Sequence, residues 1–294
     1  SQNLYSAKVS QNKILMKKFF KKHKIKTPNF AIVDNFNKAK KFFLNNKLSE
    51  AIIKPFNSSG SRGVFRIKNL NELKVYKKII YKNYNQNKII IEEFIDGPQL
   101  STESILFNNN IFTPGFSLRN YLDTKYLLPQ VIENGGVMPN KLDRYRNKVE
   151  AIKLKLAKLL KIKSGVIKGD FVLDRNNNVQ IIEFTTRLSG GDFSESLAPL
   201  SNGINYVKEL IKIYAGREIT SKNLSRKKTI FCANRYFFTP PGKFQKIRGL
   251  NKIKKISNIK KLLFYYKIGE KVHNIDSHGK RLGVFVVTAN SKKN

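Results

Sequence analysis

Residues 169–184 have the sequence GDFVLDRNNNVQIIEF, in which two apolar segments flank a polar turn. A symmetric four-residue loop at 175–178 would make a β-hairpin that places Asp170 opposite Glu183. The same register pairs Val172 with Ile181 and Asp174 with Val179. Because like charges directly opposite each other destabilise a sheet, the two carboxylates need a divalent cation, a shared proton or solvent. Oxygen ligands suit Mg²⁺, which usually also binds waters and phosphate oxygens, although an exposed hairpin with two ordinary acids fits the stretch equally well.

The composition of the 294-residue chain excludes several classes of protein. Hydrophobic residues make up 40% and aromatic residues 11%, which argues against global disorder and allows a sizeable core in one to three domains. The only cysteine, Cys232, cannot build an internal disulfide framework and favours a reducing, cytoplasmic compartment. No apolar run approaches the roughly 18 residues of a membrane-spanning helix, so we expect no membrane partner.

The charge balance is strongly basic. Lys and Arg total 57 and Asp and Glu total 20, which gives a formal net charge of +37. Such a charge favours binding to nucleic acids. However, lysine is abundant throughout, asparagine fills turns such as 108–110, and lysine greatly outnumbers arginine, which base recognition prefers. We therefore expect a solvated basic surface that attracts small anions, and no nucleic-acid partner.

Apolar periodicity predicts an α+β protein. Helices are predicted at residues 11–24, 37–45, 71–81, 142–159 and 204–214. Strands are predicted at residues 30–33, 51–54, 64–67, 88–94, 99–107, 111–118, 231–238, 262–266 and 284–288, in addition to the hairpin.

A loop rich in serine and glycine, at 58–63, separates the predicted strands 51–54 and 64–67. Glycines allow backbone N–H groups to approach phosphates, and serine hydroxyls add donors. Lys54 ends the apolar strand before this loop and needs an anionic partner if it is buried. The loop lacks the Gly-Lys-Ser/Thr of a P-loop and the dinucleotide fingerprint, so either a phosphate-binding loop or an ordinary hairpin loop fits it.

Two further segments place polar side chains at the ends of strands. An apolar strand runs into Glu92 and Glu93, which is typical of an ordinary strand end or of a hinge that hydrogen-bonds a purine base. Arg187 follows Glu183 by four residues and precedes a Ser-Gly-Gly turn at 189–191. An arginine there can bind a carboxylate or an acyl phosphate bidentately, or pair with any acid at the surface.

Taken in this order, the segments resemble the ATP-grasp superfamily, in particular its L-amino-acid ligases, biotin carboxylases and phosphoribosylglycinamide synthetases. The resemblance extends from about Gln11 to the last predicted strands. The segments VIENGGVMP at 131–139 and RLSGG at 187–191 resemble the amino-acid ligase branch. The resemblance implies the ATP-grasp fold, in which two α+β subdomains hold a nucleotide between them. It also implies a small β-rich C-terminal part. The corresponding ranges are 1–95 for the N-terminal helix and small nucleotide-binding subdomain, 96–220 for the large subdomain with the metal site, and 221–294 for the C-terminal part.

The resemblance implies a role for each segment. Lys13 and Lys54 correspond to the two nucleotide-binding lysines, and Asp170 and Glu183 to the Mg²⁺ carboxylates. Arg187 corresponds to the arginine that steadies the acyl phosphate or the substrate. The implied loop over the β- and γ-phosphates comprises Ser58, Ser59, Gly60, Ser61 and Gly63; Glu92 faces the adenine amino group; Glu93, Phe94 and Ile95 form the hinge; and Glu133, Ser189 and Gly190 contact substrate.

Several features depart from the family pattern. Gln99 replaces the glutamate that usually binds the ribose, although an amide can still hydrogen-bond there. Asp170 replaces the commoner metal-binding glutamate, and Thr185 stands where many members have an asparagine. The Rossmann-like domain that usually precedes this fold is missing before residue 1, so we expect an incomplete chain or a divergent member.

The resemblance implies an ATP- and Mg²⁺-dependent carboxylate–amine ligase with small-molecule substrates. The γ-phosphate of ATP would pass to a carboxylate, and an amine would attack the resulting acyl phosphate to form an amide. Two alternatives stay open: a carboxylase-type relative that activates bicarbonate, and a basic nucleic-acid-binding protein on a degenerate ATP-grasp scaffold. The histidines, His23, His273 and His278, are expected at the surface, and the frequency of symmetric dimers favours a homodimer.

Overall fold

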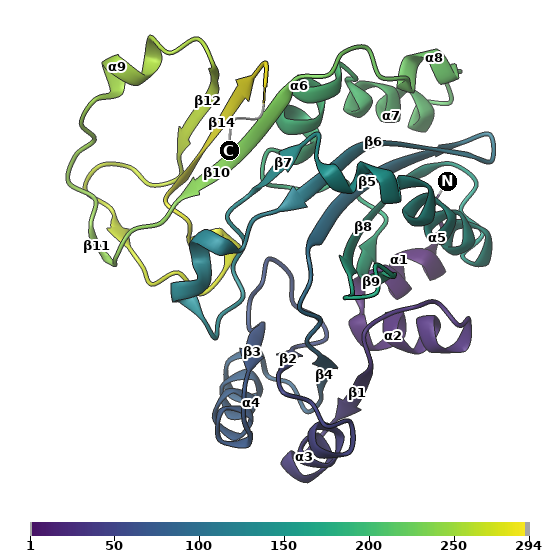
Figure 1. Ribbon diagram of the computed structural model, residues 1–294, viewed down its shortest axis with the longest axis vertical. Coiled ribbons are helices and arrows are strands. Elements are labelled where there is room, and N and C mark those ends of the chain that lie inside the picture. The colour runs from purple at the N-terminus through teal and green to yellow at the C-terminus, as the bar shows by residue number, and fades with distance from the viewer. Residues whose placement is uncertain (1, 292–294) are drawn as a thin grey trace.

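A four-stranded antiparallel sheet with two helices on one face forms one end of the computed structural model, which describes residues 2–291 (Figure 1). Its strands and helices are, in spatial order, β1 (Phe30–Val33), β4 (Ile89–Glu93), β2 (Ala51–Lys54) and β3 (Phe65–Ile67), with α3 (Phe36–Asn45) and α4 (Leu70–Tyr84). Ile53 and Ile91 are fully buried beneath these helices. Asn35 and Asn69 cap the two helices, because each side chain accepts a backbone N–H from the first turn.

An eight-stranded antiparallel sheet forms the larger part of the molecule. Its strands are, in spatial order, β12 (Ile259–Phe264), β14 (Gly283–Ala289), β10 (Phe231–Phe237), β7 (Gly136–Met138), β6 (Asn110–Arg119), β5 (Gln99–Phe107), β8 (Gly165–Leu173) and β9 (Val179–Thr185). The strands after residue 221 therefore continue the sheet begun by the residues of the 96–220 range. No separate sheet of comparable size forms within the described part of the 221–294 range; the ribbon of β11 (Gly242–Lys243) and β13 (Lys271–Val272) is the only additional pairing there.

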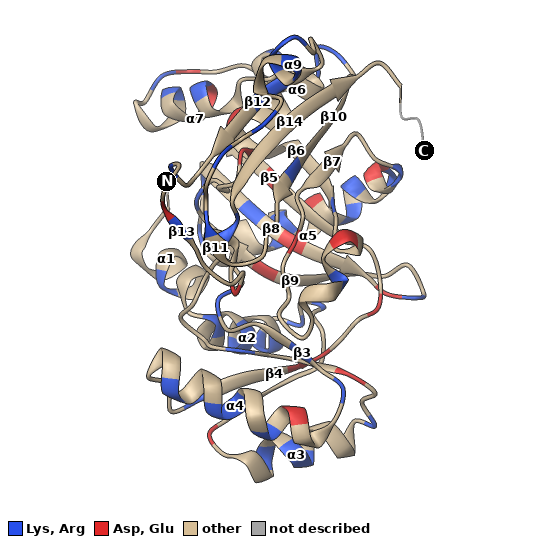
Figure 2. Cartoon of the chain, turned by 90° about the vertical axis from the view of Figure 1, so that its left-hand side faces the viewer, with Lys and Arg blue, Asp and Glu red and all other residues tan. Residues whose placement is uncertain are grey.

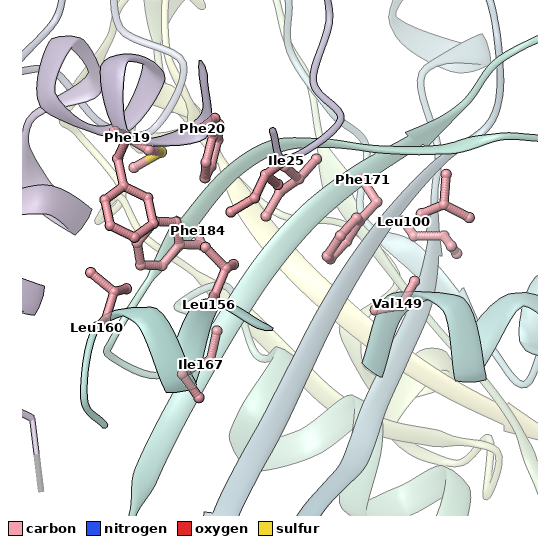
Figure 3. Close-up of a cluster of buried hydrophobic side chains, with 14 of the residues drawn as sticks. Phe19, Phe20, Ile25, Leu100, Val149, Leu156, Leu160, Ile167, Phe171 and Phe184 are labelled. Atoms are coloured by element: carbon pink, nitrogen blue, oxygen red, sulfur yellow. The ribbon is translucent and has the colours of Figure 1, made fainter. Parts of the chain in front are cut away.

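Alternation along β8 separates a core from a polar surface. Ile167 and Phe171 point to the core side of the sheet, where they pack with Phe184 and with helix α5 (Arg146–Leu159) (Figure 3). Lys168 and Asp170, which lie between these positions in the sequence, point to the opposite face. The helices on the core side are α1 (Leu4–Gln11), α2 (Lys13–Lys22) and α5 (Arg146–Leu159).

A second core lies around Tyr206 and Val166, where a turn of π-helix and three short helices pack on the sheet. These elements are η3 (Phe193–Leu197), α6 (Ala198–Asn202), α7 (Tyr206–Tyr214) and α8 (Ser221–Leu224). The remaining elements are the 3₁₀ turns η1 (Leu122–Leu127), η2 (Lys141–Tyr145) and η4 (His278–Lys280), and the helix α9 (Leu250–Lys254).

The first helices differ from the sequence prediction. Helix α1 was not predicted, and the buried face of α2 carries Met16, Phe19 and Phe20, whereas Leu15 is 43% exposed. Phe20 packs against Phe184 in the core of the large sheet. The apolar face of the N-terminal helices thus packs on the large sheet, while Lys17 of α2 contacts Glu92 of the small sheet.

The hairpin register was predicted correctly at the acids and wrongly beyond them. Asp170 pairs with Glu183, but Phe171, not Val172, lies opposite Ile181. Leu173, not Asp174, lies opposite Val179, because the turn takes one residue more than the symmetric loop assumed. A register shift between Asp170 and Phe171 compensates for this difference, as a β-bulge does.

Basic side chains are spread over the molecule. Figure 2 shows Lys and Arg on α2, α3 and α4 at one end and on α9 at the other. Within residues 2–291, no helix is both long and apolar enough to span a membrane. Cys232 is buried in β10, and burial raises the pKa of its thiol to about 12.

Candidate active site

A cavity of about 680 Å³ lies between the four-stranded and the eight-stranded sheet. Side chains from β2 and β4 line it on one side, and side chains from β5, β6, β8 and β9 line it on the other. The predicted site residues in its lining are Lys13, Lys54, Ser58, Ser59, Gly60, Ser61, Glu92, Glu93, Phe94, Ile95, Gln99, Glu133, Asp170, Glu183, Arg187, Ser189 and Gly190.

Gly63 is the predicted site residue that the lining does not include. Its φ of +71° is in the left-handed region, and a Cβ built on it would lie 2.7 Å from the ring of Tyr84. Gly63 is therefore required by the backbone turn and by the close approach of Tyr84.

Two buried lysines hold the carboxylate of Glu92. Lys54 Nζ donates a 2.8 Å hydrogen bond to Glu92 Oε2. Lys17 Nζ lies 2.8 Å from Glu92 Oε1 and forms an ion pair with it, but the geometry is not that of a hydrogen bond. Burial lowers the pKa of Lys17 to about 8, while the charge of Glu92 opposes that shift. Burial would by itself raise the pKa of Glu92, but the two ammonium groups hold it below its usual value. Glu92 is thus shared by two lysines, and its predicted contact with adenine stays a prediction.

The 58–63 loop is fastened to the body of the protein by polar contacts. Lys13 Nζ donates to the carbonyl oxygen of Ser58, and Ser58 Oγ donates to the carbonyl oxygen of Arg62 at 3.0 Å. Gly60 and Ser61 both have φ near +60°, which the glycine adopts freely and the serine only at a cost. The loop joins β2 to β3 and presents its hydroxyls at the edge of the cavity that Lys13 also lines.

The facing carboxylates of β8 and β9 point into the cavity. Ser101 Oγ donates to Asp170 Oδ1 at 2.8 Å, while Lys168 Nζ and Arg119 Nη1 approach Oδ2, the arginine at 3.3 Å. Glu183 lies 3.6 Å from Lys13 Nζ. Burial would raise the pKa of Glu183, but the charges of Lys13 and Lys168 hold it well below its usual range.

The donor set of this pair fits one divalent cation that also binds phosphate oxygens. Asp170 and Glu183 offer carboxylate oxygens from directly opposite positions, as Mg²⁺ sites on phosphate substrates usually do. Among residues 2–291, no group of three or more His, Cys, Asp and Glu side chains is placed to enclose a metal by itself. Thr185 Oγ1 donates to the carbonyl oxygen of Arg187 at 3.4 Å. Phosphate oxygens and waters would thus have to complete the coordination shell.

A second charged cluster adjoins this pair through Arg119, which contacts both Asp170 and Glu133. Arg119 donates from Nε to Glu133 Oε2 at 2.7 Å, and its Nη2 lies at the same distance. Burial would raise the pKa of Glu133, but Arg119 lowers it to about 2. Arg281 donates from Nη2 to the carbonyl oxygen of Glu133 at 2.7 Å and stacks 3.7 Å from the centre of the Tyr236 ring. Glu133 Oε1 makes no hydrogen bond within the described chain and can accept one from a ligand.

The segment after β9 is positioned from beneath by Glu103, a fully buried residue of β5. Its carboxylate accepts hydrogen bonds from the backbone N–H of Ser189, from Ser194 Oγ and from Tyr206 Oη. Arg187 is exposed and donates from Nη1 to the carbonyl oxygen of Leu188 at 2.9 Å. A Cβ on Gly190 would meet no atom within 4 Å, so the space beside it is open to a ligand.

Sequence reasoning missed several side chains of the cavity. Arg119 ends a buried strand as Lys54 does, and this shared signal could have identified it. Lys168 precedes Asp170 by two residues and thus shares its face of the strand. No local signal identifies Arg281. The surface prediction for His278 was wrong, because this residue lines the cavity, whereas His273 is exposed.

Comparisons with known proteins agree with this geometry. The family model of the phosphoribosylglycinamide synthetase ATP-grasp (A) domain matches residues 11–121, and that of the L-amino acid ligase C-terminal domain 2 matches residues 235–294. The chain is 25% identical over 198 residues to a D-alanine–D-alanine ligase of Prochlorococcus marinus (strain MIT 9301), covering 62% of this chain and 53% of that protein. It therefore spans about half the length of this curated relative.

Solved structures share the fold at low sequence identity. The L-amino acid ligase from Bacillus licheniformis superposes with a TM-score of 0.81 at 20% identity, over 99% of this chain and 70% of that one. The N5-carboxyaminoimidazole synthetase from Staphylococcus aureus, solved in complex with ADP, superposes with a TM-score of 0.74 at 16% identity, over 99% and 70% of the respective chains. Two sheets enclose a cavity of lysines and facing carboxylates, and the family model of an ATP-grasp domain matches residues 11–121, so the chain has the ATP-grasp fold.

Proposed function

We propose that this protein is an ATP- and Mg²⁺-dependent carboxylate–amine ligase that forms an amide through an acyl phosphate, with amino acids or related small acids and amines as substrates. The observation that carries the proposal is the pairing of Asp170 with Glu183 on one cavity wall, opposite the lysines and the Ser/Gly loop. The C-terminal match to an L-amino acid ligase model supports the choice of substrates, and so does Glu133 Oε1, which lies 3.8 Å from Arg281 Nη2 and can still accept a hydrogen bond from an ammonium group.

The nucleotide would lie in the half of the cavity next to the small sheet. Glu93, Phe94 and Ile95 line the wall on which the adenine would lie, with Gln99 beside the ribose. Lys54 and Lys13 would contact the phosphates, and the 58–63 loop would cover them. Because Lys54 is already paired with Glu92, its ammonium group is fixed in place before the nucleotide arrives, which lowers the cost of ordering it.

The reaction follows from this placement. The substrate carboxylate attacks the γ-phosphorus, the bond to the β-phosphate oxygen breaks, and ADP leaves. The amine then attacks the acyl carbon, phosphate leaves with the electrons of the broken bond, and the nitrogen loses a proton. Asp170 and Glu183 would hold Mg²⁺, which neutralises charge on the transferring phosphoryl group. Arg187 and Lys168 would stabilise the anionic oxygens, so catalysis consists mainly of positioning and electrostatics.

The test is a screen of amino acids and small acids for ADP formation, with hydroxylamine present to trap an acyl phosphate as a hydroxamate. We expect ADP formation to require a carboxylate and to produce the hydroxamate. Replacing both metal carboxylates, Asp170→Asn with Glu183→Gln, should lower the rate by about 100-fold or more, since a bound metal supplies several kcal/mol of charge stabilisation. Unchanged turnover in this double variant would reject the metal assignment, and ADP formation with bicarbonate alone would favour the carboxylase-type alternative.

A further inference from the structure

The 58–63 loop is also attached to the C-terminal end of the chain, through His278. The backbone N–H of His278 donates to the carbonyl oxygen of Gly60 at 2.9 Å, and its Nε2 lies 3.1 Å from Ser61 Oγ. The loop lies between β2 and β3 of the small sheet, whereas His278 precedes β14 of the large sheet. One imidazole therefore connects the two walls of the cavity.

The same ring nitrogen contacts the segment that carries Glu133. The backbone N–H of Glu133 donates to His278 Nε2 at 3.4 Å, and Gln130 Nε2 donates to the carbonyl oxygen of Ser61 at 2.7 Å. Because a backbone N–H can only donate, Nε2 must be an unprotonated acceptor in this arrangement, and Ser61 Oγ then donates to it as well. Burial, followed by the charge of Arg281, lowers the pKa of His278 to about 3, which keeps the ring neutral.

We propose that His278 is a positioning residue that ties the Ser/Gly loop to the Glu133 segment, so that the loop closes over the cavity only while the substrate end is also in place. This inference rests on the proposed function, in which the loop covers the phosphates and Glu133 contacts a substrate. It gives His278 a role that neither a metal ligand nor a general base would have, since the ring acts only through Ser61 and Glu133.

The arrangement has a mechanistic consequence. An acyl phosphate hydrolyses if water enters, so the loop must be closed when the intermediate forms and must open to release ADP. The contact between Ser61 Oγ and His278 Nε2 suits this purpose, because it breaks when the loop moves away from His278. An alanine at 278 removes both bonds, whereas a glutamine can place a carbonyl oxygen near the position of Nε2.

The experiment measures hydrogen–deuterium exchange of the loop amides, residues 58–64, with and without a non-hydrolysable ATP analogue and Mg²⁺. His278→Ala should speed loop exchange by about 10-fold to 30-fold, the effect of two lost hydrogen bonds, and leave exchange in helix α4 unchanged. Ser61→Ala should give part of this effect, and the Ser61→Ala/His278→Ala double variant no more than His278→Ala alone. His278→Gln should restore loop protection most of the way. The matched control is His273→Ala, an exposed histidine of the same segment, which should behave as wild type.

Two results would overturn the inference: loop exchange at the wild-type rate in both His278 variants, or equal acceleration by His273→Ala and His278→Ala. If His278→Ala does not fold, the Gln variant and Ser61→Ala give the same comparison. Exchange requires no turnover, so a protein without ligase activity would refute the proposed function and still allow the tie to be tested. With active enzyme, His278→Ala should raise KM for MgATP by about tenfold with a smaller change in kcat.

Discussion

Gly97, which follows the predicted adenine hinge, offers the sharpest test of how the two sheets are joined. A Cβ built on Gly97 would lie 1.8 Å from the carbonyl oxygen of Leu173 and 3.7 Å from a methyl group of Val172. The first contact is more than 1 Å too short, and its partner is a backbone atom of β8 that cannot rotate away. Gly97→Ala must therefore move the hinge or the end of β8, where Leu173 N–H donates to the Pro98 carbonyl oxygen at 3.1 Å.

The size of the effect follows from this contact. Overpacking in a well-packed region usually costs about 1–3 kcal/mol, and a rigid backbone partner places Gly97→Ala at the upper end, about 3 kcal/mol. For a chain of this length such a loss lowers the melting temperature by about 5–10 °C. The control is Gly242→Ala, because a Cβ at Gly242 meets no atom within 4 Å and its φ is not left-handed.

The assay compares the melting temperatures of the two variants and of the wild type. It then measures the nucleotide affinity of each variant that folds. We expect Gly242→Ala to melt at the wild-type temperature. Gly97→Ala should melt at a lower temperature and bind a fluorescent ATP analogue more weakly, because its displaced backbone adjoins the wall on which we propose that the adenine lies. A Gly97→Ala protein that melts within about 1 °C of wild type would show that this approach of hinge and β8 is wrong.

Two other predictions concern buried charges. Lys17→Met removes a lysine whose pKa of about 8 in the folded protein lies below the ordinary lysine value of 10.5. The unfolded chain therefore binds more protons between these two values, and wild-type stability rises with pH there. The variant lacks this rise. Urea unfolding at pH 8 and at pH 9.5 should show that the free energy of unfolding of the wild type increases by about 1–2 kcal/mol relative to that of Lys17→Met. It should not increase relative to that of a control variant at the exposed Lys18. Glu103→Gln should lower stability by about 2–3 kcal/mol in thermal unfolding, because the Ser189 N–H can then meet an amide N–H; unchanged melting would contradict this.

The sequence predicted the parts of the site that depend on local pattern. Apolar alternation placed most strands, and the polar turn of the hairpin located the pairing of Asp170 with Glu183. That pairing was right although its neighbours were wrong, because a bulge compensated for a turn one residue longer than assumed. Whether a strand contains a bulge depends on tertiary packing, which a single sequence does not specify.

The residues missed by sequence reasoning are those whose environment comes from distant segments. Lys17 lies on the apolar face of α2, although lysine side chains are usually solvated. Only the approach of Glu92 from a distant strand explains its burial. His278 lies in a polar segment, which is typical of a surface loop, and its contacts are made with the 58–63 loop and with Glu133. In both cases the long-range pairing that decides the role leaves no periodicity in the local sequence.

The net charge of +37 and the charge of the cavity have different consequences. Most of the basic side chains are solvated and screened, so they act on ligands only as a weak attractive field. The cavity lining instead combines seven Lys and Arg residues with five Asp and Glu residues, and several of them are buried. Beside it, the buried Lys17 and Lys54 share the single carboxylate of Glu92, so positive charge exceeds negative charge where water is scarce. Buried charge in excess is costly, and an anionic ligand relieves that cost.

A magnesium-bound triphosphate is a ligand of that kind, since the metal would occupy the two carboxylates and release Lys13 and Lys168 to meet phosphate oxygens, while Arg119 would keep its pairing with Glu133. Contacts with phosphate oxygens would then replace the ion pairs of Lys13 and Lys168. Nucleotide affinity should therefore fall with salt less steeply than the overall charge suggests, because the Lys and Arg side chains of the cavity are few and shielded from bulk ions. A salt dependence of the affinity as steep as that of a nucleic-acid-binding protein would place the decisive charges on the surface instead.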